Sequence, residues 1–428
     1  MNMDSLSEEL EKIKISNFSS SLIRNFIYLI ENTYVPQFSH GEHHPCDEHD
    51  YEDFRKIIDT NLEQIKYNFY DVLKSIKDDC DKQLPILIHL IIIVGEQSEQ
   101  SHWNTQKSVS LAHNILEEIC NFLNIERISQ FFTNNLNDNL KKVLITLRPK
   151  LLKNTWKNYP AAVLCYKWIL HQTQAPKLLE YLSDVLPTAL IIYDDYVPAN
   201  RILGLKCIHK ILEHSSMQHE FVRSGYVDVL YDALEKLTRH RETEYIIPLY
   251  SCLTTVLMNL EYGNTSNTYE WTKRDNIIGT LLDNMEFETN LELRHAYMTS
   301  LPQLLTNIGC AKWCERLTRL LSEYCGNHTD LRTLRATLQV AETILSMFHV
   351  RIPSHCLELY SAFLKLHYDL TETPIFDEEI IRSLERCIYL LYNITPAIGS
   401  KVIRDDRMRS IIKNNLHFSC FTDTKYCN

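Results

Sequence analysis

Apolar residues along this chain recur every three to four positions over most of its length, which is the period of helices that bury one face. The sequence has only nine glycines and no Asn-Gly or Asp-Gly pair, so it offers almost no signal for tight β-hairpins. We therefore expect an almost wholly helical chain. The clearest helices are expected at 19–34, 51–76, 84–94, 109–123, 128–136, 140–147, 159–171, 177–193 and 402–414. Marked polar loops are expected at 36–50, 95–104 and 261–270.

The most informative stretch, residues 186–212, has the pattern of two helices joined by a short turn. Pro187 is expected in the first turn of the first helix, where its missing N–H leaves no hydrogen bond unmade. Pro198 prevents this helix from continuing, and Asn200 is expected to cap the second helix.

An acidic turn residue followed five or six positions later by an arginine recurs from this stretch onward. The four pairs are Asp195–Arg201, Glu288–Arg294, Asp330–Arg335 and Asp377–Arg382. Their arginines are separated by 93, 41 and 47 residues, and a HEAT repeat is about 40–47 residues long. The longest separation would hold two repeats, of which one, centred near Pro248, lacks the arginine. Coincidence is the alternative, because acids and arginines are common residues.

This spacing predicts an all-α fold, an α-solenoid of HEAT/armadillo-like helical repeats. Each turn acid is expected to receive a helix N-terminus and to pair with the arginine of its own or a stacked repeat. We expect an irregular N-terminal helical region at 1–150, with a histidine-rich loop at 36–50, and a HEAT-like repeat region at 151–428. The boundary is approximate, and one continuous solenoid is the alternative.

Composition narrows the class of protein. The chain has 428 residues, 45% of them hydrophobic, and a formal net charge of −11, which argues against nucleic acid or an anionic membrane surface as a partner. The longest apolar run, 84–94, is too short to span a bilayer, and residues 1–15 have no signal-peptide pattern. Thirteen cysteines without a secretory signal predict free thiols in a reducing compartment, the cytoplasm, with the nucleus as a further location.

Two clusters contain metal-ligand residue types, and neither has a standard zinc spacing. The first lies in the loop 40–49 and consists of His40, His43, His44, Cys46 and His49. An ordinary exposed loop is the favoured interpretation. The second consists of Cys310, Cys314, Cys325 and His328. One helix is expected to separate Cys314 from Cys325 by about 16 Å, so they cannot share an ion. We expect no metal and no cofactor.

Catalytic signatures are missing from the sequence. It contains no GxxxxGK or GxGxxG phosphate loop, no GxSxG nucleophile turn and no HExxH metal motif. The scarcity of glycine also argues against nucleotide chemistry, because backbone cradles for phosphate need it. We expect a protein that is not an enzyme.

The segment 187–237 resembles the Tel-two-interacting protein 2 family, the smallest subunit of the TTT (Triple T) co-chaperone complex. The residues that match the family pattern are Asp194, Asp195, Asn200, Arg201, Gly204, Leu205, Cys207, Ile208, His209, Tyr231, Ala233 and Leu234. Two positions depart from it, since Ile208 replaces the commoner leucine and Lys210 replaces a second histidine. The resemblance covers about fifty residues well and the rest only in character and length.

The resemblance implies a non-catalytic scaffold in a hetero-oligomer. Its expected partners are Tel-two and Tel-two-interacting protein 1 type subunits. Together they would deliver newly made phosphatidylinositol-3-kinase-related kinases, of the mTOR, ATM and ATR type, to the heat-shock chaperone. The kinases and the chaperone would thus be indirect partners, and DNA-damage and TOR signalling would depend on them.

Other functions remain as alternatives. A HEAT-type nuclear-transport or trafficking adaptor would need acids along one inner helix face, whereas the acids here are expected at the turns. A metalloenzyme would have to use the loop 40–49. Within the motif, Gly204 and Cys207 are small enough for helices to approach closely, and we favour a structural role for Asp194, Asp195 and Arg201 over a role in partner contacts.

Overall fold

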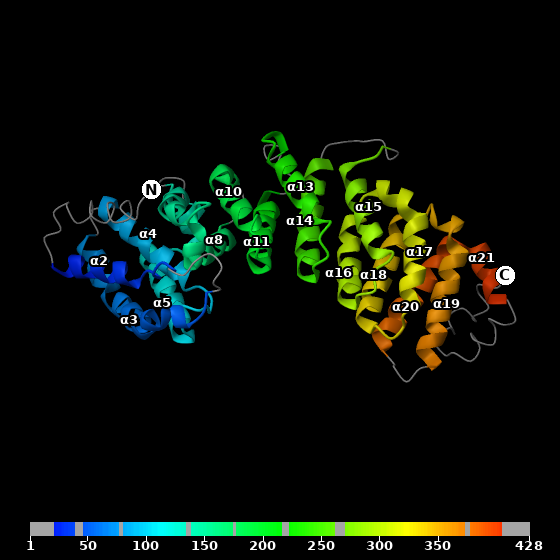
Figure 1. The fold of residues 1–428 in the computed structure, drawn as a ribbon, viewed down its shortest axis with the longest axis horizontal. Helices are drawn as coiled ribbons and strands as arrows, with labels where there is room; N and C mark the ends of the chain where they lie inside the picture. The colour runs from blue at the N-terminus through cyan, green and yellow to red at the C-terminus, as the bar shows by residue number, and fades with distance from the viewer. Residues whose placement is uncertain are drawn as a thin grey trace. The chain divides into compact units, whose positions relative to one another are not determined.

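The structure is a computed structural model, which describes residues 21–38, 46–76, 80–133, 138–173, 177–215, 222–261, 270–372 and 377–404. All regular structure in these ranges is helical, and they contain no strand, so the predicted all-α class is confirmed. The chain divides into two compact units, Met1–Ser215 and Ser216–Asn428 (Figure 1). The expected change in repeat regularity near residue 150 stays a prediction.

The first unit contains helices of unequal length. They are α2 (Ser21–Thr33), α3 (Glu52–Ser75), α4 (Cys80–Glu96), α5 (Gln106–Leu123), α6 (Ile128–Thr133), α7 (Asn139–Leu147), α8 (Pro160–Gln172), α9 (Lys177–Glu180), α10 (Leu182–Tyr193) and α11 (Pro198–Ser215). Helix α3 packs against α2 and α5, α4 packs against α8, and α11 packs against α10, α8 and α9. Three short 3-10 helices complete the unit, at His49–Tyr51, Arg148–Leu151 and Trp156–Asn158.

The second unit is a regular two-layered stack. Its helices are α13 (Tyr226–Leu237), α14 (Thr243–Glu261), α15 (Lys273–Met285), α16 (Leu291–Leu304), α17 (Cys314–Cys325), α18 (Leu331–Met347), α19 (Cys356–Glu372), α20 (Glu378–Ile394) and α21 (Pro396–Arg404). Helices α14, α16, α18 and α20 pack side by side in that order, while α17 packs against both α15 and α19 in the other layer (Figure 1). Short 3-10 helices lie at Ile308–Trp313 and Ile352–Ser354. This is the stacking of a HEAT/armadillo-like solenoid.

Apolar faces at the helical period account for the packing. In α3 the buried side chains include Phe54, Ile58, Leu62, Ile65 and Phe69, at spacings of three or four. Each such side chain contributes roughly 1.5–3 kcal/mol when it leaves water. Because the helices lie side by side, neighbouring helices bury these apolar faces.

Two details of the expected helix pair at 186–212 were wrong. Pro187 lies inside α10, which begins five residues earlier at Leu182, and not in the first turn. Asn200 is not a cap, because α11 already begins at Pro198. Proline has a fixed φ that suits the first helical position, so Pro198 both ends the turn and starts the helix.

Other boundaries differ less. The helix expected at 177–193 is interrupted at Tyr181, and α4 extends to Glu96, into the loop expected at 95–104. Only Val402–Arg404 of the helix expected at 402–414 is described, as the end of α21. Most of the loop expected at 261–270 lies outside the described residues.

Helices α10 and α11 approach so closely that only glycine fits at one position. A Cβ on Gly204 would lie 2.4 Å from the backbone nitrogen of Tyr193 and 2.5 Å from its Cα. Backbone atoms cannot move aside as a flexible side chain can. The close approach thus depends on Gly204, as its small size indicated.

We expect Gly204→Ala to lower the free energy of unfolding by about 1–3 kcal/mol, because the added methyl group must push the two helices apart. The matched control is Gly279→Ala, also within a helix, where a Cβ would meet only the Trp313 ring at 3.3 Å. Since alanine is the better helix former, this control should be neutral or stabilising. Urea unfolding of both variants tests the idea, and wild-type stability of Gly204→Ala would contradict it.

Candidate functional site

The turn between α10 and α11 is organised around the buried carboxylate of Asp195, which is 6% exposed. Its Oδ1 accepts a hydrogen bond from the backbone N–H of Tyr196 at 2.7 Å and lies 3.1 Å from Nζ of Lys157. Its Oδ2 accepts a hydrogen bond from the side-chain amide of Asn200 at 2.7 Å. One side chain therefore connects the turn, the first turn of α11 and the 3-10 helix that contains Lys157.

Arg201 binds the backbone of Asp195 and not its carboxylate in the hydrogen bond that links the two residues. Its Nε donates to the backbone oxygen of Asp195 at 3.0 Å, so the six-residue spacing reflects a side chain-to-backbone hydrogen bond. Lys157, which the sequence analysis did not single out, forms an ion pair with the Asp195 carboxylate. Lys157 also lies over the ring of the exposed Tyr196, with Nζ 4.7 Å from the ring centroid.

The electrostatics of the turn favour the ionised form of Asp195. Burial opposes the charge and by itself raises the pKa of Asp195. Hydrogen bonds from Asn200 and Lys157, and the positive charge of Lys157, lower it further than burial raises it, so the net pKa lies below its usual value. The ionised carboxylate thus stabilises the folded state.

The remaining motif residues do not form one site. Asp194 is exposed at the C-terminus of α10, and Cys207 is fully buried, where burial raises the pKa of its thiol to about 12. His209 lies on α11 with Nδ1 3.6 Å from the Glu213 carboxylate. Tyr231 belongs to α13 of the second unit, where its hydroxyl donates to the backbone oxygen of Lys273 at 3.3 Å.

The arrangement at Asp195 recurs in the second unit. Nη1 of Arg294 donates to the backbone oxygen of Glu288 at 3.1 Å, again across six residues. The Glu288 carboxylate accepts the backbone N–H groups of Thr289 and Asn290, both at 2.9 Å. Arg294 also lies 3.3 Å from Glu323 on α17.

The two pairs with five-residue spacing behave differently. Asp330 and Asp377 are the N-caps of α18 and α20, and their side chains accept hydrogen bonds from backbone N–H groups in the first turn. Arg335 reaches the next repeat, with Nη2 3.1 Å from Asp377 and 3.0 Å from Glu379. Arg382 pairs with Glu378 of its own helix. Of these two arginines, only Arg335 connects successive turns of the stack.

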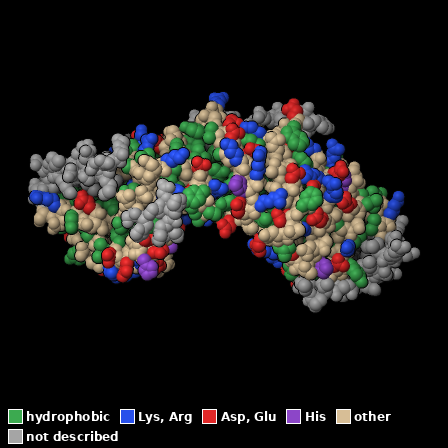
Figure 2. Space-filling model, in the orientation of Figure 1, with side chains coloured by type: hydrophobic (Ala, Val, Ile, Leu, Met, Phe, Trp, Pro, Cys, Tyr) green, Lys and Arg blue, Asp and Glu red, His purple; other side chains and the backbone are tan. Residues whose placement is uncertain are grey.

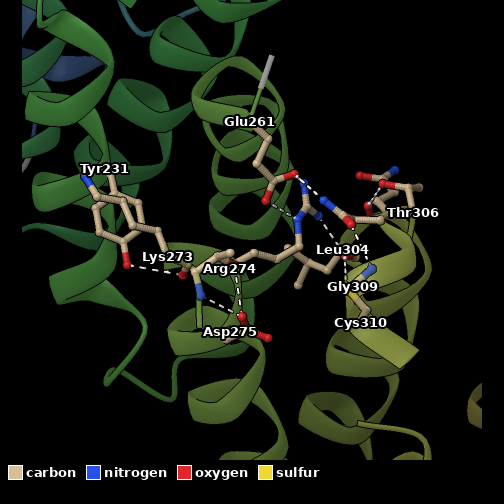
Figure 3. Close-up of polar contacts among 12 residues, drawn as sticks. Tyr231, Glu261, Lys273, Arg274, Asp275, Leu304, Thr306, Gly309 and Cys310 are labelled. Atoms are coloured by element: carbon tan, nitrogen blue, oxygen red, sulfur yellow. Dashed lines mark hydrogen bonds and ion pairs between the residues drawn. The ribbon is translucent and has the colours of Figure 1, made fainter. Parts of the chain in front are cut away.

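A buried ion pair that the sequence analysis missed connects α14, α15 and α16 (Figure 3). Arg274 is 2% exposed and binds both carboxylate oxygens of Glu261, at 2.8 and 2.9 Å. Its Nη1 donates to the backbone oxygen of Leu304 at 2.7 Å, and the Asn307 amide also donates to Glu261. Bidentate geometry of this kind gives the strongest charged hydrogen bonds.

Asp275, the next residue, organises the other side of α15. It forms a capping box with Thr272 and lies 2.7 Å from Nζ of Lys312, and it accepts the indole N–H of Trp313 at 2.9 Å. Burial raises the pKa of Asp275, but these hydrogen bonds lower it more, and the net pKa lies below its usual value. The Thr-Lys-Arg-Asp sequence is a recognisable capping signal, whereas its distant partners have no local signature.

The candidate metal ligands do not come together within the described residues, where no group of three or more such side chains is found. Cys310, Cys314 and Cys325 are buried, and α17 separates Cys314 from Cys325 as expected. His328 lies 3.9 Å from Asp369. Of the five candidate ligands in the loop 40–49, only Cys46 and His49 are among the described residues. Among the described helices, none combines the length and the hydrophobicity needed to span a bilayer.

These features define a helical-repeat protein of the HEAT/armadillo-like class, in which charged turn residues connect the helices through hydrogen bonds and ion pairs. A family model for the Tti2 family matches residues 87–395, so the chain belongs to the Tti2 family. The chain is 29% identical to TELO2-interacting protein 2 of Homo sapiens over 302 residues, and this alignment covers 67% of the chain and 58% of the relative. It is 27% identical over 292 residues to TELO2-interacting protein 2 of Rattus norvegicus, covering 66% of this chain and 57% of the relative.

The chain therefore spans less than two thirds of the length of these relatives. Among solved structures, the crystal structure of an engineered protein matches with a TM-score of 0.47 and 12% identity, over 97% of this chain and 94% of its own.

We expect Asp195→Asn to cost about 1–3 kcal/mol at pH 7, because a buried, hydrogen-bonded carboxylate and its pairing with Lys157 are lost. A depressed pKa contributes stability above the pKa of the unfolded state, and this contribution is lost as pH falls through the lower folded pKa. The difference between variant and wild type should thus shrink below about pH 4. Urea unfolding at pH values from 7 to 3 measures it.

The neighbouring Asp194→Asn is the matched control, because Asp194 is exposed. It should change the free energy of unfolding by less than about 0.5 kcal/mol. A cost for Asp195→Asn that stays constant from pH 7 to pH 3 would show that its charge is not the cause.

We expect Arg274→Ala to lower the free energy of unfolding by about 3 kcal/mol or more, since it removes a buried guanidinium with three hydrogen bonds and leaves Glu261 with the Asn307 amide but no cation. The control is Arg332→Ala, which removes a pair with Glu292 whose two side chains are each 61% exposed and should cost less than about 1 kcal/mol. Equal costs for the two variants, measured by urea unfolding, would contradict the structural role of Arg274.

Proposed function

We propose that this chain is a non-catalytic scaffold subunit of the TTT co-chaperone complex. In this role it supports the assembly, maturation and stability of phosphatidylinositol-3-kinase-related kinases with the heat-shock chaperone machinery, in the cytoplasm and the nucleus. The observation that carries the proposal is the match to the Tti2 family over residues 87–395. The name of the curated relatives, TELO2-interacting protein 2, favours a TELO2-type subunit as a direct partner.

The outer edge of the second unit suits such a role. Charged pairs that connect successive turns there are exposed: Arg332 with Glu292, and Arg335 with Glu379, have side chains that are 56–74% exposed. Figure 2 shows acidic and basic side chains interspersed on the displayed face of this unit, without one large region of a single sign. Exposed pairs contribute little to stability, so they can exchange partners on binding and provide specificity.

Purification of the tagged protein from its own cells at moderate salt, followed by mass spectrometry, tests the proposal. The expected result is two other large helical-repeat proteins in near-equal amount, with traces of giant kinases and of the chaperone. Recovery of a transport GTPase with basic cargo would contradict it and make the chain an adaptor.

The motif arginine should act on binding only through the fold. We expect Arg201→Glu to lower the melting temperature and the recovery of partners together, because it breaks the hydrogen bond to Asp195 and places a negative charge beside that buried carboxylate. The control is Arg239→Glu, at an exposed position near the end of α13, which should leave both unchanged. Lost partners at an unchanged melting temperature would instead make Arg201 a contact residue.

A further inference from the structure

A groove of about 540 Å³ runs between α2 and α3 in the first unit. We propose that it binds an extended, uncharged segment of a partner polypeptide. This inference rests on the proposed function only in so far as that function requires protein partners. The groove lies outside the 187–237 motif and outside the charged turns of the second unit.

Side-chain amides line both walls of the groove. Asn61, Gln64 and Asn68 face it from α3, and Asn25 and Asn32 face it from α2. Asn61 and Asn68, like Asn25 and Asn32, are seven residues apart, which is about 10.5 Å along a helix. Three residues of an extended chain cover about the same distance. The amides are thus spaced to follow an extended peptide backbone.

An amide side chain offers the same groups as a peptide bond, N–H donors and one C=O acceptor. It can therefore replace the neighbouring strand with which an extended segment would pair. Amides on both walls allow the backbone of a bound segment to make hydrogen bonds on either side, whatever its side chains are.

Three of the amides are already held in place by one hydrogen bond each. Asn61 donates to the backbone oxygen of Asn32 at 3.2 Å, Asn32 to that of Tyr28 at 2.7 Å, and Asn68 to that of Gln64 at 2.8 Å. Among the described residues, nothing else bonds to the second N–H or to the carbonyl oxygen of these three side chains. Groups fixed before binding lose less conformational entropy when a ligand arrives.

The chemistry of the lining selects for an uncharged segment. Beside the amides, the lining consists of Leu22, Phe26, Tyr28, Leu29 and Ile57. No Asp, Glu, Lys, Arg or His is among the described residues that form these walls. A charged side chain in the groove would lose water without gaining a counter-ion, which is costly. Exposed apolar surface on Leu22, Tyr28 and Ile57, at 38%, 67% and 47%, is available to a neutral side chain.

Photo-cross-linking in cells tests the proposal with the full-length chain. The photoreactive residue p-benzoylphenylalanine replaces Tyr28, and the cross-linked peptides are sequenced by mass spectrometry. We expect a cross-link to another protein of the co-purified assembly, within a stretch of at least about four consecutive uncharged residues. A cross-link to residues 1–20 of the same chain, to a second copy or to a charged segment would overturn the proposal, as would the absence of any cross-link.

A pair of charge-introducing substitutions provides the second arm. Gln64→Glu with Asn68→Asp should reduce the cross-link yield about tenfold or more, because two carboxylates then lie in a groove whose described lining contains no cation. Asn61 is left unchanged, since its hydrogen bond joins α3 to α2. Gln339→Glu, at an exposed position of α18 in the second unit, is the matched control and should leave the yield unchanged.

Equal yields from the double variant and the control would overturn the groove as the binding site, provided that melting temperatures match the wild type. This failure is distinct from failure of the proposed function. In the first case the co-chaperone partners still co-purify but the cross-link is missing or lies elsewhere, whereas in the second case those partners do not co-purify at all.

Discussion

No helix of this protein can bury its apolar face alone, and the described residues include no sheet against which it could pack. Each helix is therefore stable only because a neighbouring helix covers it, and the distance between neighbours decides how much surface leaves water. Gly204 shows how strict this requirement is, since a Cβ there would lie 2.4 Å from the backbone of Tyr193. In the second unit the same requirement produces two regular layers, with α14, α16, α18 and α20 in sequence.

The charged turn residues serve this packing. Asp330 and Asp377 accept backbone N–H groups that a helix start leaves without partners. Arg201 and Arg294 bind the backbone of their turns, and Arg335 binds the acid of the next repeat. Arg274 does the same at a buried position, where it connects three helices through Glu261 and Leu304. The most recognisable residues of the sequence are thus largely structural. We propose that partners bind instead at exposed edges and at the groove between α2 and α3.

Much of the fold could be predicted from the sequence because helical periodicity is a local signal. It located most helices to within a few residues, and the repeat spacing of the arginines indicated stacking. The prediction that Asn200 caps a helix was wrong because two local signals competed. Proline favours the first helical position and asparagine favours the cap, and the helix begins at Pro198. The buried contacts of Arg274 could not be predicted, because Glu261 lies 13 positions before it in the sequence and Leu304 lies 30 positions after it. Contacts of this kind depend on tertiary packing, which no local pattern encodes.

The turn at 194–204 stabilises the packing of α10 on α11, and we expect it to be fully formed before any partner binds. Hydrogen-exchange mass spectrometry of the purified chain, alone and within its assembly, tests it most directly. The amide of Tyr196 is bonded to the Asp195 carboxylate and that of Arg201 to the Val197 carbonyl. We expect this segment to exchange slowly and equally in both states, while new protection appears on exposed surfaces. Fast exchange in the isolated chain that becomes slow only in the assembly would contradict the account and make the turn an interface.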